Sequence, residues 1–185
     1  PETTPGDFLS LLYGMVDSYR MRKEYKLALF SCQKIISTLK EVNLPYSDGE
    51  ARTMEIMGDL HSAIGRKSDY FNAMELYRLS AKIMRKNQGP SDGSLLRLYV
   101  KMANILGLKM NEHEKALNLF CLVLHSNLKN NANSKPFIEL SALEGEGDVL
   151  FDKCAHKCAI RRYTSIMKYI DELEESDKTW KEKYE

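Results

Sequence analysis

The chain has 185 residues, of which 43% are apolar, and this content is sufficient for a continuous hydrophobic core. Its 27 Lys and Arg residues nearly balance its 26 Asp and Glu residues, which argues against the strongly basic composition of a dedicated nucleic-acid-binding protein. No apolar run approaches the roughly 18 residues that cross a bilayer, and residues 1–4 do not resemble a secretory signal.

Helical periodicity and helix-breaking residues predict eight helices. In the first segment Leu9, Leu12 and Val16 recur at intervals of three and four residues, which is the spacing of an amphipathic helix. Ser47 and Glu50 have the spacing of a capping box and mark the start of the third helix. No comparable stretch alternates polar and apolar residues as a strand does. We predict helices near residues 5–20, 24–42, 48–64, 69–87, 93–109, 112–128, 135–152 and 156–174.

Short turns join these predicted helices in pairs. The turns cover residues 21–24, 65–68, 109–112 and 151–154, and a tight turn places two successive helices side by side and antiparallel. The C-terminal residues 176–185 form either a capping helix, which packs Trp180 and Tyr184 over the last pair, or a tail. We predict one domain over residues 1–175, with repeats at about 5–45, 47–89, 92–131 and 134–175.

One residue pattern recurs in all four pairs. Each first helix contains a small residue near its centre, and each second helix opens with Tyr or His, followed three residues later by Ala. A small residue lets two helices approach closely, while the ring fills space between successive pairs. The alanines lie 45, 43 and 43 residues apart, a period typical of arrays of helix pairs. The small residues are Val16, Gly58, Ala103 and Gly147, the rings are Tyr25, Tyr70, His113 and His156, and the alanines are Ala28, Ala73, Ala116 and Ala159.

This arrangement resembles the tetratricopeptide repeat family over nearly the whole chain. The period exceeds the family's usual length of about 34 residues, and it is similar to the longer repeats of kinesin light chains and spindle-orientation adaptors. Val16 is larger than the Gly or Ala usual in the family, so we expect the first hairpin to be splayed or shifted in register. The resemblance implies an all-α, right-handed solenoid of about four antiparallel helix hairpins.

The resemblance also implies a binding site for a peptide. In this family the first helix of each pair lines a concave groove that docks a segment of a partner protein. Residues three or four apart on each first helix share one face. Carried over residue by residue, the implied peptide-binding set is Tyr13, Asp17, Arg20, Arg52, Glu55, Asp59, Arg97, Lys101, Asn104, Glu144, Asp148 and Asp152.

The charges of this set predict a partner with residues of both signs. The third pair, with Arg97 and Lys101, suits an acidic or carbonyl-rich stretch, whereas the second and fourth pairs present carboxylates that suit basic residues. Asp17, Glu55 and Asp59 would repel a carboxylate, which disfavours a clamp for the C-terminus of a chaperone.

We therefore interpret the chain as a noncovalent protein–protein interaction module, a scaffold or adaptor that needs no cofactor. There is no Gly-rich phosphate loop, no Gly-x-Ser-x-Gly turn and no His-Glu-x-x-His helix, so we predict that the chain is not an enzyme. The four cysteines lack the spacing of a disulfide scaffold, which favours a reducing compartment inside the cell, the cytoplasm or the nucleus. Because the sequence begins with Pro1 rather than Met, we expect a piece of a longer protein.

Two alternatives stay open at this point. Basic and aromatic residues interleave in two clusters, as they do on surfaces that track a nucleic-acid backbone. Potential zinc ligands also lie close together at Cys121 with His125, and in the run from Cys154 through His156 to Cys158, although neither set contains a Cys-x-x-Cys pair. The two basic and aromatic clusters are Tyr19, Arg20, Arg22, Lys23 and Tyr25, and Tyr77, Arg78, Lys82, Arg85 and Lys86.

Overall fold

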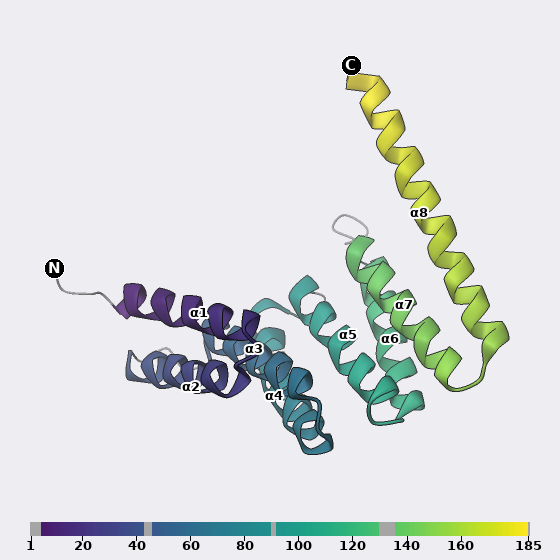
Figure 1. The fold of residues 1–185 in the computed structure, drawn as a ribbon. Coiled ribbons are helices and arrows are strands. Elements are labelled where there is room, and N and C mark those ends of the chain that lie inside the picture. The colour runs from purple at the N-terminus through teal and green to yellow at the C-terminus, as the bar shows by residue number, and fades with distance from the viewer. Residues whose placement is uncertain (1–4, 43–45, 90–91, 130–135, 185) are drawn as a thin grey trace. The chain divides into compact units, whose positions relative to one another are not determined.

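The computed structural model describes residues 5–42, 46–89, 92–129 and 136–184, and of residues 127–129, 173–174 and 176–184 it describes the backbone alone. These described residues form eight α-helices and no strand (Figure 1). The predicted all-α fold of helix hairpins is confirmed. The helices are α1 (Pro5–Met21), α2 (Tyr25–Glu41), α3 (Asp48–Ile64), α4 (Lys67–Gln88), α5 (Gly93–Leu108), α6 (His113–Lys129), α7 (Pro136–Asp152) and α8 (His156–Tyr184).

The end of the chain differs from the prediction. α8 continues without a break to Tyr184, so residues 176–184 form neither a separate ninth helix nor a nonhelical tail. The sequence from 156 to 184 contains no Gly or Pro, and nothing in it stops the helix. The side chains of Trp180 and Tyr184, for which we predicted packing over the last pair, lie outside the described residues.

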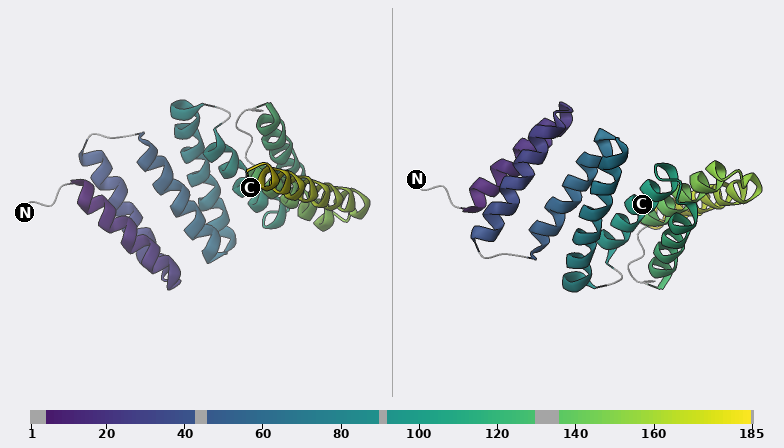
Figure 2. Two further views of the ribbon diagram at one scale, coloured as in Figure 1. Left: turned by 90° about the horizontal axis from the view of Figure 1, so that it is seen from above. Right: turned by 90° about the horizontal axis from the view of Figure 1, so that it is seen from below.

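The chain divides into two compact units, Pro1–Leu98 and Tyr99–Glu185. In the first unit, α1 packs on α2, α2 on α3, and α3 on α4 (Figures 1 and 2). In the second unit, α6 packs on α7, and α7 on α8. α2 therefore contacts both its own partner, α1, and the first helix of the following pair, α3.

The helix boundaries follow from local chemistry. The Ser47 side chain caps α3 by accepting a hydrogen bond from the Glu50 N–H at 3.2 Å, and the Glu50 carboxylate accepts the Tyr46 N–H at 2.5 Å. Gly65 ends α3 in the left-handed conformation, with a φ of 80°. In the other three hairpins the left-handed residue is not Gly but Lys23, Asn111 or Cys154.

The recurring small residues and alanines are buried inside the hairpins, as the pattern predicts. Ala28, Ala73, Ala116 and Ala159 are all inaccessible to solvent or nearly so. Val16 is buried too, in a core cluster that includes Cys32. The residue four positions after the alanine is Cys32 here but a bulky ring in the other three hairpins, Tyr77, Phe120 and Tyr163. The smaller partner leaves room for the larger Val16 to be buried inside the first hairpin.

Candidate peptide-binding site

Two tyrosines fix the packing of the second and fourth hairpins. A Cβ added at Gly58 would lie 2.7 Å from Cδ1 of Tyr77, and a Cβ added at Gly147 would lie 2.7 Å from Cε1 of Tyr163. Each ring therefore lies directly on the glycine of the facing helix. The position after the glycine is Asp in both hairpins, and it accepts the tyrosine hydroxyl, at 2.6 Å for Asp59 and 2.7 Å for Asp148.

These hydrogen bonds change the acidity of both tyrosines. Burial, followed by the nearby Asp59 carboxylate, raises the pKa of Tyr77 far above its usual range. The hydrogen bond to Asp148, followed by desolvation, raises the pKa of Tyr163 to about 12. Both hydroxyls therefore stay protonated, and keep donating to their carboxylates, to a higher pH than an ordinary tyrosine would. Asp59 and Asp148, which the sequence assigned to peptide binding, are already hydrogen-bonded within their own hairpins.

The third hairpin lacks this pair. Asn104 occupies the position of Asp59 and Asp148, but the ring that corresponds to the tyrosines is Phe120, which has no hydroxyl. The Oδ1 atom of Asn104 is buried without a hydrogen-bond partner. It lies close to Gly145, where an added Cβ would be 2.5 Å from this oxygen. Asn104 is thus another predicted groove residue that faces the protein interior.

A cavity of about 510 Å³ in the first unit brings together seven of the twelve predicted site residues. Its lining combines three apolar residues, Val16, Ile56 and Met84, with seven charged residues. Asp48, Gln88 and Ser94 also line it and were not predicted, because they lie at helix ends rather than on the predicted face. The seven predicted residues in its lining are Tyr13, Asp17, Arg20, Arg52, Glu55, Asp59 and Arg97.

Several side chains in this cavity are held by defined contacts. The Tyr13 hydroxyl lies 2.8 Å from Oγ1 of Thr53 and donates to the Gly49 carbonyl at 3.2 Å. The guanidinium of Arg52 lies over the Tyr13 ring, 5.6 Å from its centroid, in a cation–π contact. Arg20 pairs with Asp17 at 3.3 Å on the exposed face of α1. The contact with Tyr13 thus holds the Arg52 guanidinium at the cavity lining.

The remaining predicted residues lie in the second unit. Asp152 lies at the end of α7, where its carboxylate is 2.8 Å from Nε2 of His113. Glu144 is exposed on α7, and Lys101 is half-buried on α5. None of the residues that line the first unit's cavity comes from this set.

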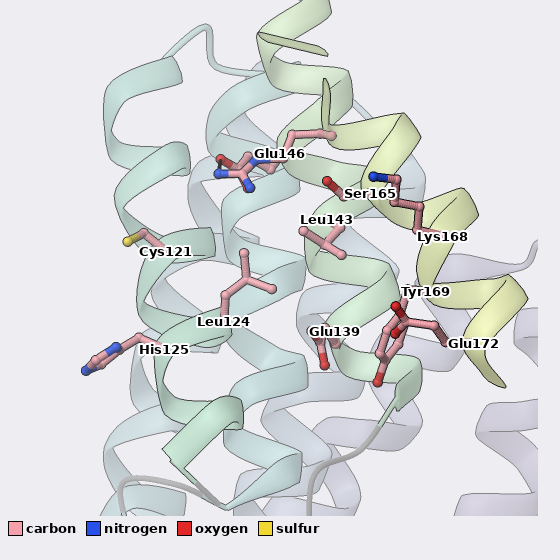
Figure 3. A pocket seen from close by; sticks show the side chains of 11 residues that line it. Cys121, Leu124, His125, Glu139, Leu143, Glu146, Ser165, Lys168, Tyr169 and Glu172 are labelled. Atoms are coloured by element: carbon pink, nitrogen blue, oxygen red, sulfur yellow. Dashed lines mark ion pairs between the residues drawn. The ribbon is translucent and has the colours of Figure 1, made fainter. Parts of the chain in front are cut away.

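A second cavity, of about 550 Å³, lies among α6, α7 and α8 (Figure 3). Arg162 pairs with Glu146 at 2.9 Å on its wall. Cys121 and His125, which the sequence singled out as potential zinc ligands, also line it. In the described part of the chain no group of three or more His, Cys, Asp or Glu side chains is arranged to hold a metal ion. The predicted peptide-binding set contains none of its lining residues, because eight of the eleven come from the second helices α6 and α8.

The structure removes part of the basis for nucleic-acid binding. Tyr77, the aromatic member of one basic cluster, is only 2% exposed and cannot stack on a base. Its neighbour Arg78 pairs with Glu75 at 2.9 Å. In the other cluster, Tyr19 and Tyr25 are partly buried against the core of the first unit.

His156, one of the potential zinc ligands, packs its ring against Phe151, with 5.2 Å between the ring centroids.

The four thiols differ in their surroundings, and this predicts their reactivity. Burial, with a smaller contribution from Asp17, raises the pKa of Cys32 to about 12, whereas Cys121, Cys154 and Cys158 are exposed. Since the thiolate is the reactive form, we expect an aromatic disulfide reagent at pH 8 to modify three thiols rapidly and the fourth only after unfolding. Absorbance of the released thiolate measures both phases.

A Cys32→Ser variant is the matched control for this titration. It should keep the three rapid reactions and lose the slow one. Four rapid reactions in the parent chain would contradict the buried position of Cys32 in α2.

Comparisons with known proteins define the fold and leave the family open. No family model matches the sequence, and no curated protein matches it. Among solved structures, the crystal structure of BtubC (BKLC) from P. vanneervenii is similar with a TM-score of 0.80 and 11% sequence identity. The match covers 94% of this chain and 67% of that chain. At this identity the likeness shows a shared helical fold.

None of the helices in the described part of the chain has the length and apolar character of a membrane span.

Proposed function

We propose that this chain is a tetratricopeptide-like module that docks a peptide segment of a protein partner noncovalently, in the cavity of its first unit. The observation that supports this proposal is the gathering of seven predicted site residues around one cavity. Its role is that of a scaffold or adaptor and not of an enzyme.

The chemistry of the lining favours a peptide over a small apolar ligand. Seven of the thirteen lining residues are charged, while pockets for small molecules are mostly lined by apolar and aromatic side chains. The three apolar residues of the lining, Val16, Ile56 and Met84, suit one aliphatic side chain of a peptide. The charged residues of the lining suit the backbone and the charged side chains on either side of it.

Two arginines give the cavity its selectivity. Arg52 and Arg97 both lie six residues before the small residue of their helix, so they occupy equivalent positions in successive repeats. A guanidinium presents a planar set of donors that matches a carboxylate in a bidentate pair. We infer that Asp or Glu side chains of the partner pair with Arg52 and Arg97, and that basic residues of the same segment lie near Asp17 and Asp48.

Selection from a library of random peptides, followed by fluorescence anisotropy on the selected peptides, tests this proposal. Losing one side of a desolvated charge pair costs roughly 2–5 kcal/mol, so we expect the Arg52→Glu/Arg97→Glu variant to bind more than about tenfold more weakly. Acidic residues should be enriched in the selected peptides, and replacing them by Lys should weaken binding to the parent chain.

Arg78→Glu is the matched control, because Arg78 is exposed and lies outside the cavity lining. It should leave the affinity unchanged. Equal affinity of the double variant and the parent for every selected peptide would overturn the proposed site. Strong, salt-dependent binding of a generic oligonucleotide with no peptide selected would instead favour the nucleic-acid alternative.

A further inference from the structure

The cavity among α6, α7 and α8 is lined by charged residues at positions where the first unit has apolar ones. Glu146 directly precedes the small residue of α7, Arg162 lies three residues after the alanine of α8, and the two side chains pair at 2.9 Å. The equivalent residues of α3 and α4 are Met57 and Leu76, and Met57 packs against the core of the first unit. The packing of a hairpin therefore needs no charge pair at this place, and the pair is a feature of this cavity.

One antiparallel register relates the residues that α7 and α8 contribute to the lining. Arg162 of α8 pairs with Glu146 of α7. Two turns further along the same helices, Tyr169 faces Glu139 in this register and donates its hydroxyl to that carboxylate. Leu143 lies between the two glutamates on the same face of α7 (Figure 3). The chain thus supplies a guanidinium of its own to Glu146 but only a neutral phenol to Glu139.

The end of the cavity around Tyr169 has an excess of negative charge. Glu139 and Glu172 both lie there, beside the tyrosine (Figure 3). Burial, followed by Glu139 and then Glu172, raises the pKa of Tyr169, so both carboxylates act on the same hydroxyl. Among the described residues of the lining, Lys168 is the one Lys or Arg besides the paired Arg162. Two carboxylates are therefore balanced by a single ammonium group, and this end of the cavity favours a cation.

We propose that this end of the cavity binds an arginine side chain of a protein partner, with the guanidinium between Glu139 and Glu172. A guanidinium has planar donors that match carboxylates, and it stacks on an aromatic face such as the ring of Tyr169. The methylene groups of the arginine lie along Leu143, which is apolar and lines the same cavity. This site shares no residue with the cavity of the first unit, so the proposal does not depend on the peptide site there.

The lining selects arginine over the other charged side chains. Glu139 and Glu172 repel an Asp or Glu side chain of a partner. The ammonium group of lysine is a point charge, and it lacks the fork of donors that binds a carboxylate through two parallel hydrogen bonds. The volume of the cavity, about 550 Å³, accommodates an arginine side chain together with the backbone that carries it.

Titration of the isotope-labelled full chain with acetyl-Ala-Arg-Ala-amide, followed by two-dimensional NMR, tests this proposal. We expect saturable shifts of the backbone amides near Glu139 and Tyr169, with a Kd of roughly 1 mM. The same peptide with citrulline has the shape of the arginine peptide without its charge. It should bind about tenfold more weakly, because charge-assisted hydrogen bonds are roughly twice as strong as neutral ones. Equal affinity for the two peptides, or no shift near these residues, would overturn the proposal.

The Glu139→Gln/Glu172→Gln variant removes both charges and keeps an acceptor for the Tyr169 hydroxyl. It should bind the arginine peptide about tenfold more weakly, which is the combined loss of two partly exposed charge pairs. Glu144→Gln/Glu175→Gln is the matched control, since it removes the same charge at exposed positions outside the lining, and it should keep the parent affinity within about twofold. Unchanged binding in the first variant would overturn the site. Shifts confined to the first unit would also overturn it, while leaving the peptide site of that unit in place.

Discussion

Gly58→Ala is expected to lower the free energy of unfolding of this protein by about 1–3 kcal/mol, the usual range for overpacking a core. The added Cβ would lie 2.7 Å from Cδ1 of Tyr77, closer than nonbonded carbon atoms can approach. The ring has little room to move, because it is 2% exposed and its hydroxyl donates to Asp59. The two helices of the hairpin must therefore separate. Urea unfolding monitored by circular dichroism measures the loss.

Gly14→Ala is the matched control for this substitution. Gly14 lies in the interior of α1, and nothing approaches its Cβ position. Replacing Gly by Ala in an exposed helix interior usually stabilises it by roughly 0.5–1 kcal/mol, so the two variants should shift stability in opposite directions. If Gly58→Ala instead unfolds like Gly14→Ala, the ring does not pack on Gly58 and the hairpin geometry described above is wrong.

Fold and packing were predictable from the sequence because they depend on residue size at a fixed period. Gly58 and Gly147 receive a tyrosine ring, and the position of Val16 is matched by the small Cys32. In each case a larger side chain on one helix faces a smaller residue on the other helix of the hairpin. Because this pairing recurs along the chain, a single pattern predicts buried residues throughout the array. Ser47 and Glu50 likewise predicted the start of α3, since a cap involves only neighbouring residues.

Turns and the last helix were less predictable. Lys23 and Cys154 adopt the left-handed conformation, which their residue types do not favour, so only the hairpin as a whole selects it. The length of α8 depends on the absence of any helix-breaking residue, and this absence sets no particular end point. The other seven helices end within one residue of their predicted positions, so α8 is the one helix whose end the local signals missed.

Only part of the candidate site was predictable, because helical spacing identifies a shared face and not the partners of its side chains. Asp17 and Arg52, which belong to the predicted set, line the first unit's cavity. Asp59 and Asp148 share the predicted face, but each accepts a hydrogen bond from a tyrosine fifteen or more residues away. Such pairings depend on how two helices meet, which no single helix encodes.

The hydrogen bond between Tyr77 and Asp59 changes the experiment that best tests binding. Glu55 and Asp59 lie near the Tyr77 hydroxyl inside the second hairpin, whereas Arg52 and Arg97 are exposed. Replacing Glu55 and Asp59 by Lys is the charge reversal that the sequence alone suggests. Both carboxylates lie near the Tyr77 hydroxyl and contribute to its raised pKa, and Glu55 is itself buried. Breaking such interactions and burying an ammonium group costs about 2–5 kcal/mol. We therefore expect the Glu55→Lys/Asp59→Lys variant to be strongly destabilised, as measured by the urea midpoint.

Arg52→Glu/Arg97→Glu reverses the same number of charges and is the matched comparison. Both arginines are exposed, and surface substitutions usually change stability by about 0.5 kcal/mol or less, so this variant should unfold near the parent midpoint. A loss of peptide binding in the carboxylate variant then reports damage to the second hairpin, whereas a loss in the arginine variant reports the contact itself. If the carboxylate variant instead unfolds at the parent midpoint, Asp59 does not support Tyr77, and both carboxylates become direct candidates for contact with basic residues of the partner.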